Sequence, residues 1–219
     1  MNVRGRDIRL PPAGLAPRTH AEDPVEYYYK PLTGRLYRAR LRLIADLLGE
    51  TRFESLLEIG YGSGIFLPEL ARRSSRLVAI DIHGESAKVE QMLAAVGVSA
   101  ELVDASLFEL PFADGEFEAL VCVSVLEHTT ELDRALDEFR RVLKPGGVAV
   151  LGFPVRNRVT DGFFRLVGYD PRAIHPSAHG DILGAAERRA DFTLEQRAWL
   201  PRFLPLDLAA YAGCRCRAR

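Results

Sequence analysis

The stretch LLEIGYGSGIFLPELARR, residues 56–73, joins a short apolar run to a helix-like segment through three closely spaced glycines. Gly60, Gly62 and Gly64 stand at alternate positions directly after the apolar run. Glycine adopts positive φ angles at no steric cost, and it lets a ligand approach the main chain because it has no Cβ atom. A helix that follows such a loop presents unpaired N–H groups at its start. The sequence therefore predicts a loop whose backbone receives a flat or charged group.

Around this loop, the chain alternates between short strands and helices. We expect strands at residues 55–59, 76–81, 100–104, 118–125 and 148–154, and helices at 35–48, 66–73, 85–96, 131–143 and 178–190. We also expect a turn at KPGG, residues 144–147, and two more strands after residue 190. Strands that alternate with helices form right-handed β-α-β units and a parallel sheet covered on both faces. The predicted fold class is α/β, with a doubly wound, mostly parallel sheet.

Residues 1–34 are expected to form an arm before the main domain of residues 35–219. The first part of this arm is rich in Pro, Arg and Gly and has no periodicity, which favours a disordered or draped segment. Tyr27, Tyr28 and Tyr29 precede the first helix. They either close over a ligand as a lid or pack the helix onto the domain. Tyr29 is the predicted ligand contact because it is nearest to the helix.

Composition excludes several classes of function. The 219 residues carry 29 basic and 30 acidic side chains, so there is no overall basic field that would favour nucleic acid. No apolar run approaches the ~20 residues of a membrane span, and the N-terminus lacks the apolar core of a signal peptide. Three cysteines do not make a disulfide framework. We therefore expect a cytoplasmic protein that has no membrane span and binds no nucleic acid.

Carboxylates stand at the ends of three successive predicted strands. Glu58 lies two residues before Gly60 in the pattern E-x-G-x-G-x-G. This carboxylate suits a ligand with an ammonium or a sulfonium better than a phosphate, and the spacing differs from the dinucleotide pattern G-x-G-x-x-G. Asp81 can accept hydrogen bonds from ribose hydroxyls. Ile82 can pack on an adenine face, and Asp104 can accept from an adenine amine, although polar residues also end strands without binding anything.

Four segments resemble the successive motifs of the class I S-adenosylmethionine-dependent methyltransferases. They are LLEIGYGSG, VAIDI, LPFADGEFEALVCVSVLEH and RVLKPGGVAVLGFP, and they occur in the family's order and at its spacing. The resemblance covers residues 53–154 and is nearest to the small-molecule branch that includes the ubiquinone-biosynthesis type. It implies a seven-stranded sheet with a reversed terminal hairpin, and S-adenosyl-L-methionine as the cofactor. The family often has Asp at the position after Phe117, whereas this chain has Glu118. We interpret this departure as a difference in packing that leaves the ligand assignment unchanged.

The resemblance also implies which residues hold the cofactor. Glu58 and the glycines lie near the methionine moiety, Asp81 binds the ribose, and Asp104 with Ala105 lies near the adenine. The full predicted cofactor set is Glu58, Gly60, Tyr61, Gly62, Gly64, Asp81, Ile82, Asp104, Ala105, Ser124 and Tyr29.

The fourth strand leads into residues that would face the methyl acceptor. Ser124, Glu127 and His128 fall where this strand opens onto the cleft. His128 is the predicted catalytic residue, as a general base or a substrate contact, because an imidazole titrates near neutral pH. A structural role is the alternative, since the resembling family often has Glu-His here. Glu127 is expected to be a structural or ligand-facing hydrogen-bond acceptor, and residues 155–190 are expected to be an insertion that shapes the acceptor pocket.

Two other groupings raise the question of a metal or redox site. Cys214 and Cys216 form either such a pair or two positions on one face of a last strand, and Cys122 is expected to be a small buried hydrophobe. His175 and His179 are four residues apart, but a proline intervenes and no third ligand is evident. We therefore expect no metal.

The sequence thus predicts a methyltransferase that moves a methyl group from S-adenosyl-L-methionine to an O, N or C nucleophile of a small molecule. An NAD-dependent oxidoreductase would share the sheet and the ribose carboxylate, but the glycine spacing and Glu58 argue against it. A non-catalytic module that binds the cofactor is a second alternative, because its ligand loop would look the same. An RNA or protein acceptor is disfavoured by the near-neutral charge.

Overall fold

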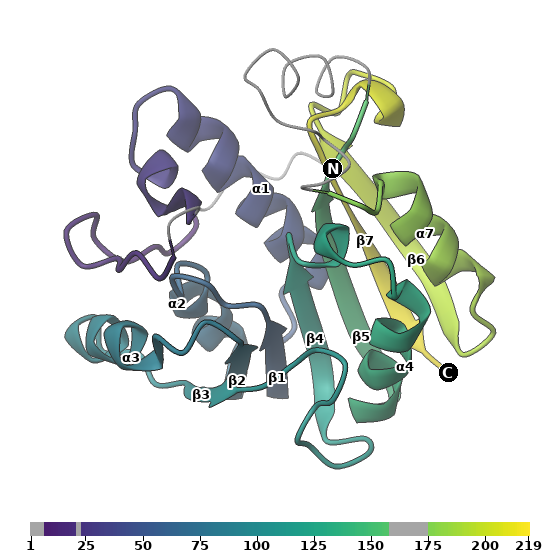
Figure 1. Ribbon diagram of the computed structural model, residues 1–219, viewed down its shortest axis with the longest axis horizontal. Helices are drawn as coiled ribbons and strands as arrows, with labels where there is room; N and C mark the ends of the chain where they lie inside the picture. Colours follow the sequence, from purple (N-terminus) through teal and green to yellow (C-terminus); the bar gives the residue numbers. More distant parts are fainter. Residues whose placement is uncertain (1–6, 21–22, 158–174) are drawn as a thin grey trace.

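The computed structural model describes residues 7–20, 23–157 and 175–219 and contains a central seven-stranded sheet (Figure 1). The strands are β1 (Phe53–Ile59), β2 (Ser74–Asp81), β3 (Glu101–Asp104), β4 (Phe117–Val123), β5 (Leu143–Pro154), β6 (Phe192–Leu200) and β7 (Tyr211–Ala218). The α-helices are α1 (Thr33–Leu48), α2 (Leu67–Leu70), α3 (Ser86–Ala95), α4 (Leu132–Val142) and α7 (His179–Arg188). Short 3-10 helices span Pro24–Tyr28, Ala71–Arg73, Leu126–His128 and Leu206–Leu208.

The strand order is β3-β2-β1-β4-β5-β7-β6. The first five strands pair in parallel, and β7 lies antiparallel to both β5 and β6. This arrangement confirms the predicted fold class and the reversed terminal hairpin. The order reverses between β1 and β4, so the connections beyond their carboxyl ends leave in opposite directions. Such a reversal opens a crevice at this edge of the sheet.

Helices cover both faces of the sheet because its strands are apolar on both sides (Figure 1). Successive strand residues point to opposite faces. In β1, Leu57 and Ile59 pack in the core that contains α4 and α7. Leu56 packs in the core that contains α1, α2 and α3. The pairing of Ile59 with Ile80 of β2 and with Cys122 of β4 fixes where β1 ends and the glycine loop begins.

Helix α1 begins and ends close to its predicted bounds. Its apolar stripe includes Leu41, Ile44 and Leu48, which are all buried. Gly49 ends the helix at φ +87°, a conformation that suits glycine. Arg215 of β7 donates hydrogen bonds to the carbonyls of residues 47 and 48, at 2.9 and 2.8 Å. These bonds satisfy two helix-end acceptors and attach α1 to the sheet.

Three predicted elements differ in detail from the structure. The expected helix at residues 66–73 is a single α-helical turn, α2, followed by the 3-10 helix Ala71–Arg73. The expected KPGG turn lies within β5, where the register with β4 shifts between the Phe117 and Ala119 pairs. The fourth strand ends at Val123 because the next residue, Ser124, has φ +57° and turns the chain out of the sheet.

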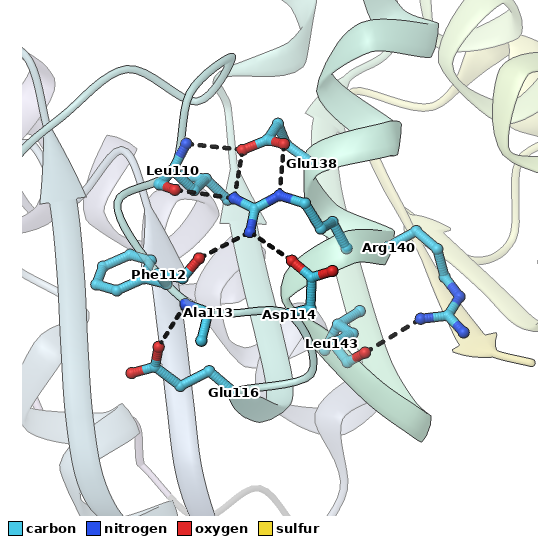
Figure 2. Close-up of polar contacts among 9 residues, drawn as sticks. Leu110, Phe112, Ala113, Asp114, Glu116, Glu138, Arg140 and Leu143 are labelled. Atoms are coloured by element: carbon cyan, nitrogen blue, oxygen red, sulfur yellow. Dashed lines mark hydrogen bonds and ion pairs between the residues drawn. The ribbon is translucent and has the colours of Figure 1, made fainter.

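The loop between β3 and β4 is fixed to α4 by the guanidinium of Arg141, whose partners Leu110, Phe112, Asp114 and Glu138 are labelled in Figure 2. Arg141 forms a two-pronged pair with Glu138, Nε–Oε1 at 2.7 Å and Nη2–Oε2 at 2.8 Å. It also donates to the carbonyls of Leu110 at 2.8 Å and Phe112 at 2.7 Å, and to Asp114 Oδ1 at 3.0 Å. A planar guanidinium is suited to such paired contacts. The loop is therefore held in one conformation beside the sheet.

The described part of the N-terminal arm contacts the main domain. The N–H of Arg9 donates to Oε2 of Glu69, a buried residue of α2, at 2.9 Å. The hydroxyl of Tyr29 donates to the carbonyl of Pro11 at 2.7 Å. The expected division into an arm of residues 1–34 and a domain of residues 35–219 remains a prediction.

All three cysteines are buried and are not joined in disulfides. Cys214 and Cys216 both lie in β7 and pack in the same core, as expected for two positions on one face of a last strand. Within the described residues, no helix combines the length and apolar character that a membrane span requires.

Candidate ligand-binding site

The glycine loop leaves β1 at the reversal of the strand order. Its three glycines, Gly60, Gly62 and Gly64, have φ angles of +75°, +50° and +68°, where other residues are strained. A Cβ atom at Gly60 would lie 2.3 Å from Val125 Cγ2, and one at Gly64 would lie 2.5 Å from Val89 Cγ1. A Cβ atom at Gly62 would have no neighbour within 4 Å. Gly62 therefore presents bare backbone to open space, while the other two glycines allow close packing.

Asp81 holds this loop from the end of β2. Its Oδ2 accepts the N–H of Gly62 at 2.8 Å, and its Oδ1 accepts the N–H of Ile82 at 2.7 Å. Each carboxylate oxygen has a second lone pair, so the carboxylate can still accept from a ligand. Ile82 is 76% exposed beside it, an apolar side chain at the edge of the cleft.

The rings of Tyr61 and His83 pack against each other at the glycine loop. His83 lies with Nε2 3.0 Å from the carbonyl oxygen of Gly62, and its Nδ1 accepts the N–H of Glu85 at 2.9 Å. Tyr61 is buried, with its ring edge-on to His83 at 4.9 Å between centroids, and burial raises its pKa to about 12. The sequence did not single out His83, although its position two residues after Asp81 was a usable signal.

Asp104 and Ala105 lie at the carboxyl end of β3, beside the end of β2. Asp104 is exposed and stands opposite Asp81 in the register of β2 and β3. The N–H of Ala105 donates to the carbonyl of Asp81 at 3.1 Å. The structure therefore brings both residues next to Asp81, and their predicted place near an adenine stays a prediction.

Glu58 is a buried carboxylate below the glycine loop. It is 3% exposed, and its Oε2 has no hydrogen-bond partner among the described residues. Burial raises the pKa of Glu58 to about 8, and the nearby charge of Asp81 adds to the rise. An ionised carboxylate in such a place is stabilised by a cation. The site can therefore favour a positively charged ligand group.

Arg40 of α1 brings a positive charge to the end of β4. Its Nη2 donates to Ser124 Oγ at 2.6 Å, and its guanidinium lies 4.4 Å from the ring centroid of Tyr211 and 4.9 Å from that of Tyr37. Ser124 Oγ also lies 3.2 Å from the hydroxyl of Tyr211. The Nε of Arg40 is buried and has no partner among the described residues. The sequence analysis missed Arg40, because helix periodicity does not reveal what a helix faces.

Of the three adjacent tyrosines, Tyr28 is the one that lies inside the domain. Tyr28 is buried, and the charges that act on its hydroxyl include those of Arg40 and Glu58. Tyr29, the predicted contact, is half-buried and is bonded to the arm, and burial raises its pKa to about 12. Tyr27 is exposed and stacks on Tyr37 at 5.6 Å between ring centroids.

A cluster of ionisable side chains lies just beyond Ser124. Glu127 is 2% exposed, and burial raises its pKa to about 7, against the effects of its own backbone N–H and of Arg40. His128 is exposed, and its ring lies 5.1 Å from that of His175 between centroids. Burial lowers the pKa of His175 to about 4, helped by the charges of His128, Arg156 and Arg40. The sequence did not predict that these residues would meet.

His175 and His179, the two histidines that are four residues apart in the sequence, have different neighbours in the structure. His179 Nε2 lies 3.2 Å from Asp207 Oδ1, at the start of α7. Residues 158–174, part of the segment 155–190 that was expected to shape the acceptor pocket, lie outside the described residues.

Comparisons with known proteins place this site in context. Residues 57–151 match the family model described as a methyltransferase domain. The ubiquinone/menaquinone biosynthesis C-methyltransferase UbiE of Haemophilus ducreyi is 30% identical over 159 residues, which cover 69% of this chain and 61% of that protein. The chain thus spans less than two thirds of the length of this curated relative.

Two solved structures have the same fold. The N-methyltransferase NodS from Bradyrhizobium japonicum, in complex with S-adenosyl-L-homocysteine, has a TM-score of 0.65 at 20% identity, covering 94% of this chain and 96% of that one. The geranyl diphosphate C-methyltransferase from Streptomyces coelicolor A3(2), with Mg2+, geranyl diphosphate and S-adenosyl-L-homocysteine, has a TM-score of 0.69 at 16% identity, with coverages of 97% and 92%. These likenesses show the fold.

Proposed function

We propose, from the premise that this chain carries a class I S-adenosylmethionine-dependent methyltransferase domain, that it transfers a methyl group to a small molecule. The observation that carries the proposal is the arrangement around Gly62. Its bare backbone faces open space, its N–H is bound by the carboxylate of Asp81, and the buried carboxylate of Glu58 precedes it at the end of β1. A ligand with a cationic amino-acid end and a ribose fits these groups better than a pyrophosphate does.

Each part of S-adenosyl-L-methionine finds a matching group. The sulfonium and ammonium would lie near Glu58, and the ribose hydroxyls would bind Asp81. The adenine would lie between Ile82 and Asp104, next to Ala105. Arg40, whose buried Nε has no partner among the described residues, would bind the carboxylate. The predicted positions Gly60, Tyr61, Gly64, Ser124 and Tyr29 complete the proposed cofactor site.

The protein's part in the reaction is to position and shield the reactants. When bound, the cofactor supplies an activated methyl group, so the chain needs to orient the acceptor and exclude water. We propose that His128, exposed beyond the end of β4, contacts the acceptor. The atom that is methylated, a cytoplasmic location and the absence of a nucleic-acid partner stay predictions.

Calorimetric titration tests the proposal with a matched pair of variants. Wild-type protein should bind S-adenosyl-L-homocysteine and should not bind NAD. Gly62→Ala and Gly97→Ala both place a Cβ at a positive φ in open space, so each should lose roughly 1–2 kcal/mol of stability. Only Gly62→Ala should lose binding of S-adenosyl-L-homocysteine, because Gly97 follows α3 and is not part of the glycine loop. Binding of NAD, or full binding by Gly62→Ala, would contradict the proposal.

A second measurement separates an enzyme from a non-catalytic module. The protein is incubated with methyl-labelled cofactor and a small-molecule fraction of a cell extract. A labelled product that disappears with Gly62→Ala is expected for a methyltransferase. Binding of S-adenosyl-L-homocysteine without any labelled product would favour the module, and label in RNA or protein would replace the small molecule as the acceptor.

A further inference from the structure

Three side chains that commonly bind metals meet beside the carboxyl end of β4. One ligand atom from each of Glu127, His128 and His175 lies within 4.8 Å of the other two. Glu127 and His128 belong to the 3-10 helix Leu126–His128, and His175 comes from the connection between β5 and α7. The grouping therefore joins two connections that leave neighbouring strands, and the sequence analysis did not predict it.

One oxygen of the carboxylate in this group has no hydrogen-bond partner among the described residues. This oxygen is Oε2 of Glu127, a residue that is 2% exposed. A carboxylate withdrawn from water needs a proton, a hydrogen-bond donor or a cation beside it. Because two imidazoles lie within reach of this carboxylate, a cation bound among the three side chains would compensate its charge.

The two segments that carry these side chains are already held against each other. The N–H of Ser177 donates to the carbonyl of Glu127 at 3.3 Å, and its hydroxyl donates to the carbonyl of Thr129 at 2.5 Å. Arg156, just after β5, donates from Nη1 to the carbonyl of His175 at 2.8 Å. Backbone bonds of this kind position ligands before a metal arrives, which lowers the cost of binding.

We propose that Glu127, His128 and His175 form a binding site for a divalent transition metal, with zinc as the representative ion. Two imidazoles and one carboxylate are a known donor set for zinc and its neighbours, whereas magnesium and calcium prefer oxygen ligands alone. Three protein ligands leave a coordination position for water or for a bound molecule. None of these three ligands belongs to the proposed cofactor residues at the ends of β1 and β2.

Neighbouring positive charges set a limit on the affinity. Arg40 and Arg156 act on His175 electrostatically and would also repel a cation. We therefore expect weaker binding than in a structural zinc site built from thiolates. Coordination also uses the lone pair that a general base needs, so a metal-bound His128 would hold the ion rather than accept a proton from the acceptor.

Metal titration of the whole chain tests the site. Zn2+ is added in competition with a chromophoric chelator, and Co2+ binding is followed by absorption. We expect one equivalent to bind to the wild type. His175→Ala and Glu127→Gln should each weaken binding by at least about tenfold, since even outer-shell changes cost 10–100-fold. His179→Ala is the matched control, because that imidazole lies beside Asp207, and it should bind like the wild type.

Two results would overturn the proposal. One is unchanged binding by His175→Ala, or by His175→Asn if the alanine variant does not fold as judged by circular dichroism. The other is a thiolate charge-transfer band in the Co2+ spectrum, which would assign the metal to the cysteines of β7. The titration requires no methyl acceptor, so its outcome does not depend on the proposed activity.

Discussion

Replacement of Glu58 by glutamine should change how the protein's stability depends on pH. Glu58 ends its strand inside the domain, 3% exposed, with one carboxylate oxygen unpartnered among the described residues. Burial raises its pKa from 4.5 to about 8, and the charge of Asp81 adds to the rise. Without a bound cation, the folded chain therefore keeps a proton on Glu58 at neutral pH, where the unfolded chain releases it.

The sign and size of the effect follow from this difference. The stability that the neutral carboxyl contributes is complete below about pH 4.5, and it is lost progressively as the pH rises to about 8. Each pH unit in this window costs about 1.4 kcal/mol. Between about pH 5.5 and about pH 7.5, the loss assigned to Glu58 is therefore roughly 3 kcal/mol. A glutamine has nearly the same shape and does not titrate, so Glu58→Gln should be spared this loss.

Urea unfolding at the two pH values measures the effect. The wild type should lose roughly 3 kcal/mol more than Glu58→Gln on going from the lower to the higher pH. Glu54→Gln is the control, because Glu54 is exposed on the same strand, and it should follow the wild type. If the wild type and Glu58→Gln change equally, Glu58 is ionised in the folded protein and the reasoning from its burial is wrong.

Three further predictions rest on other contacts. Arg141→Met removes the bonds to Glu138 and to the β3–β4 loop and should cost about 2–3 kcal/mol in thermal unfolding. Arg134→Met, on the same helix, removes a surface ion pair with Glu131 and a contact of the guanidinium with the Phe108 ring, and should cost under about 1 kcal/mol; equal losses would contradict the assignment. Arg40→Gln should weaken calorimetric binding of S-adenosyl-L-homocysteine about tenfold but spare 5′-methylthioadenosine, which has no carboxylate; equal weakening would place the carboxylate elsewhere. The three buried cysteines should react with a thiol reagent only after unfolding, and rapid reaction of the native protein would contradict their burial.

Local features of the sequence were sufficient to predict most of the elements and the glycine loop after β1. The glycines at positions 60, 62 and 64, with Glu58 before them, belong to one continuous strand-and-loop segment. Asp81 was predictable as well, because the carboxyl ends of parallel strands meet at one edge of a sheet. Errors concerned the ends of elements: the 66–73 helix is shorter than expected, and KPGG lies within β5.

The alternation of strands and helices follows from the sequence alone, since the periodicity of apolar residues indicates which face of each element is buried. The contacts of Arg40 with Ser124 and of His128 with His175 depend instead on how the elements pack. Each pair joins segments far apart in the chain. Their contact depends on the order of the strands and on how α1 and the segment after β5 lie across the sheet. No local pattern encodes that arrangement, because it results from packing of the whole core.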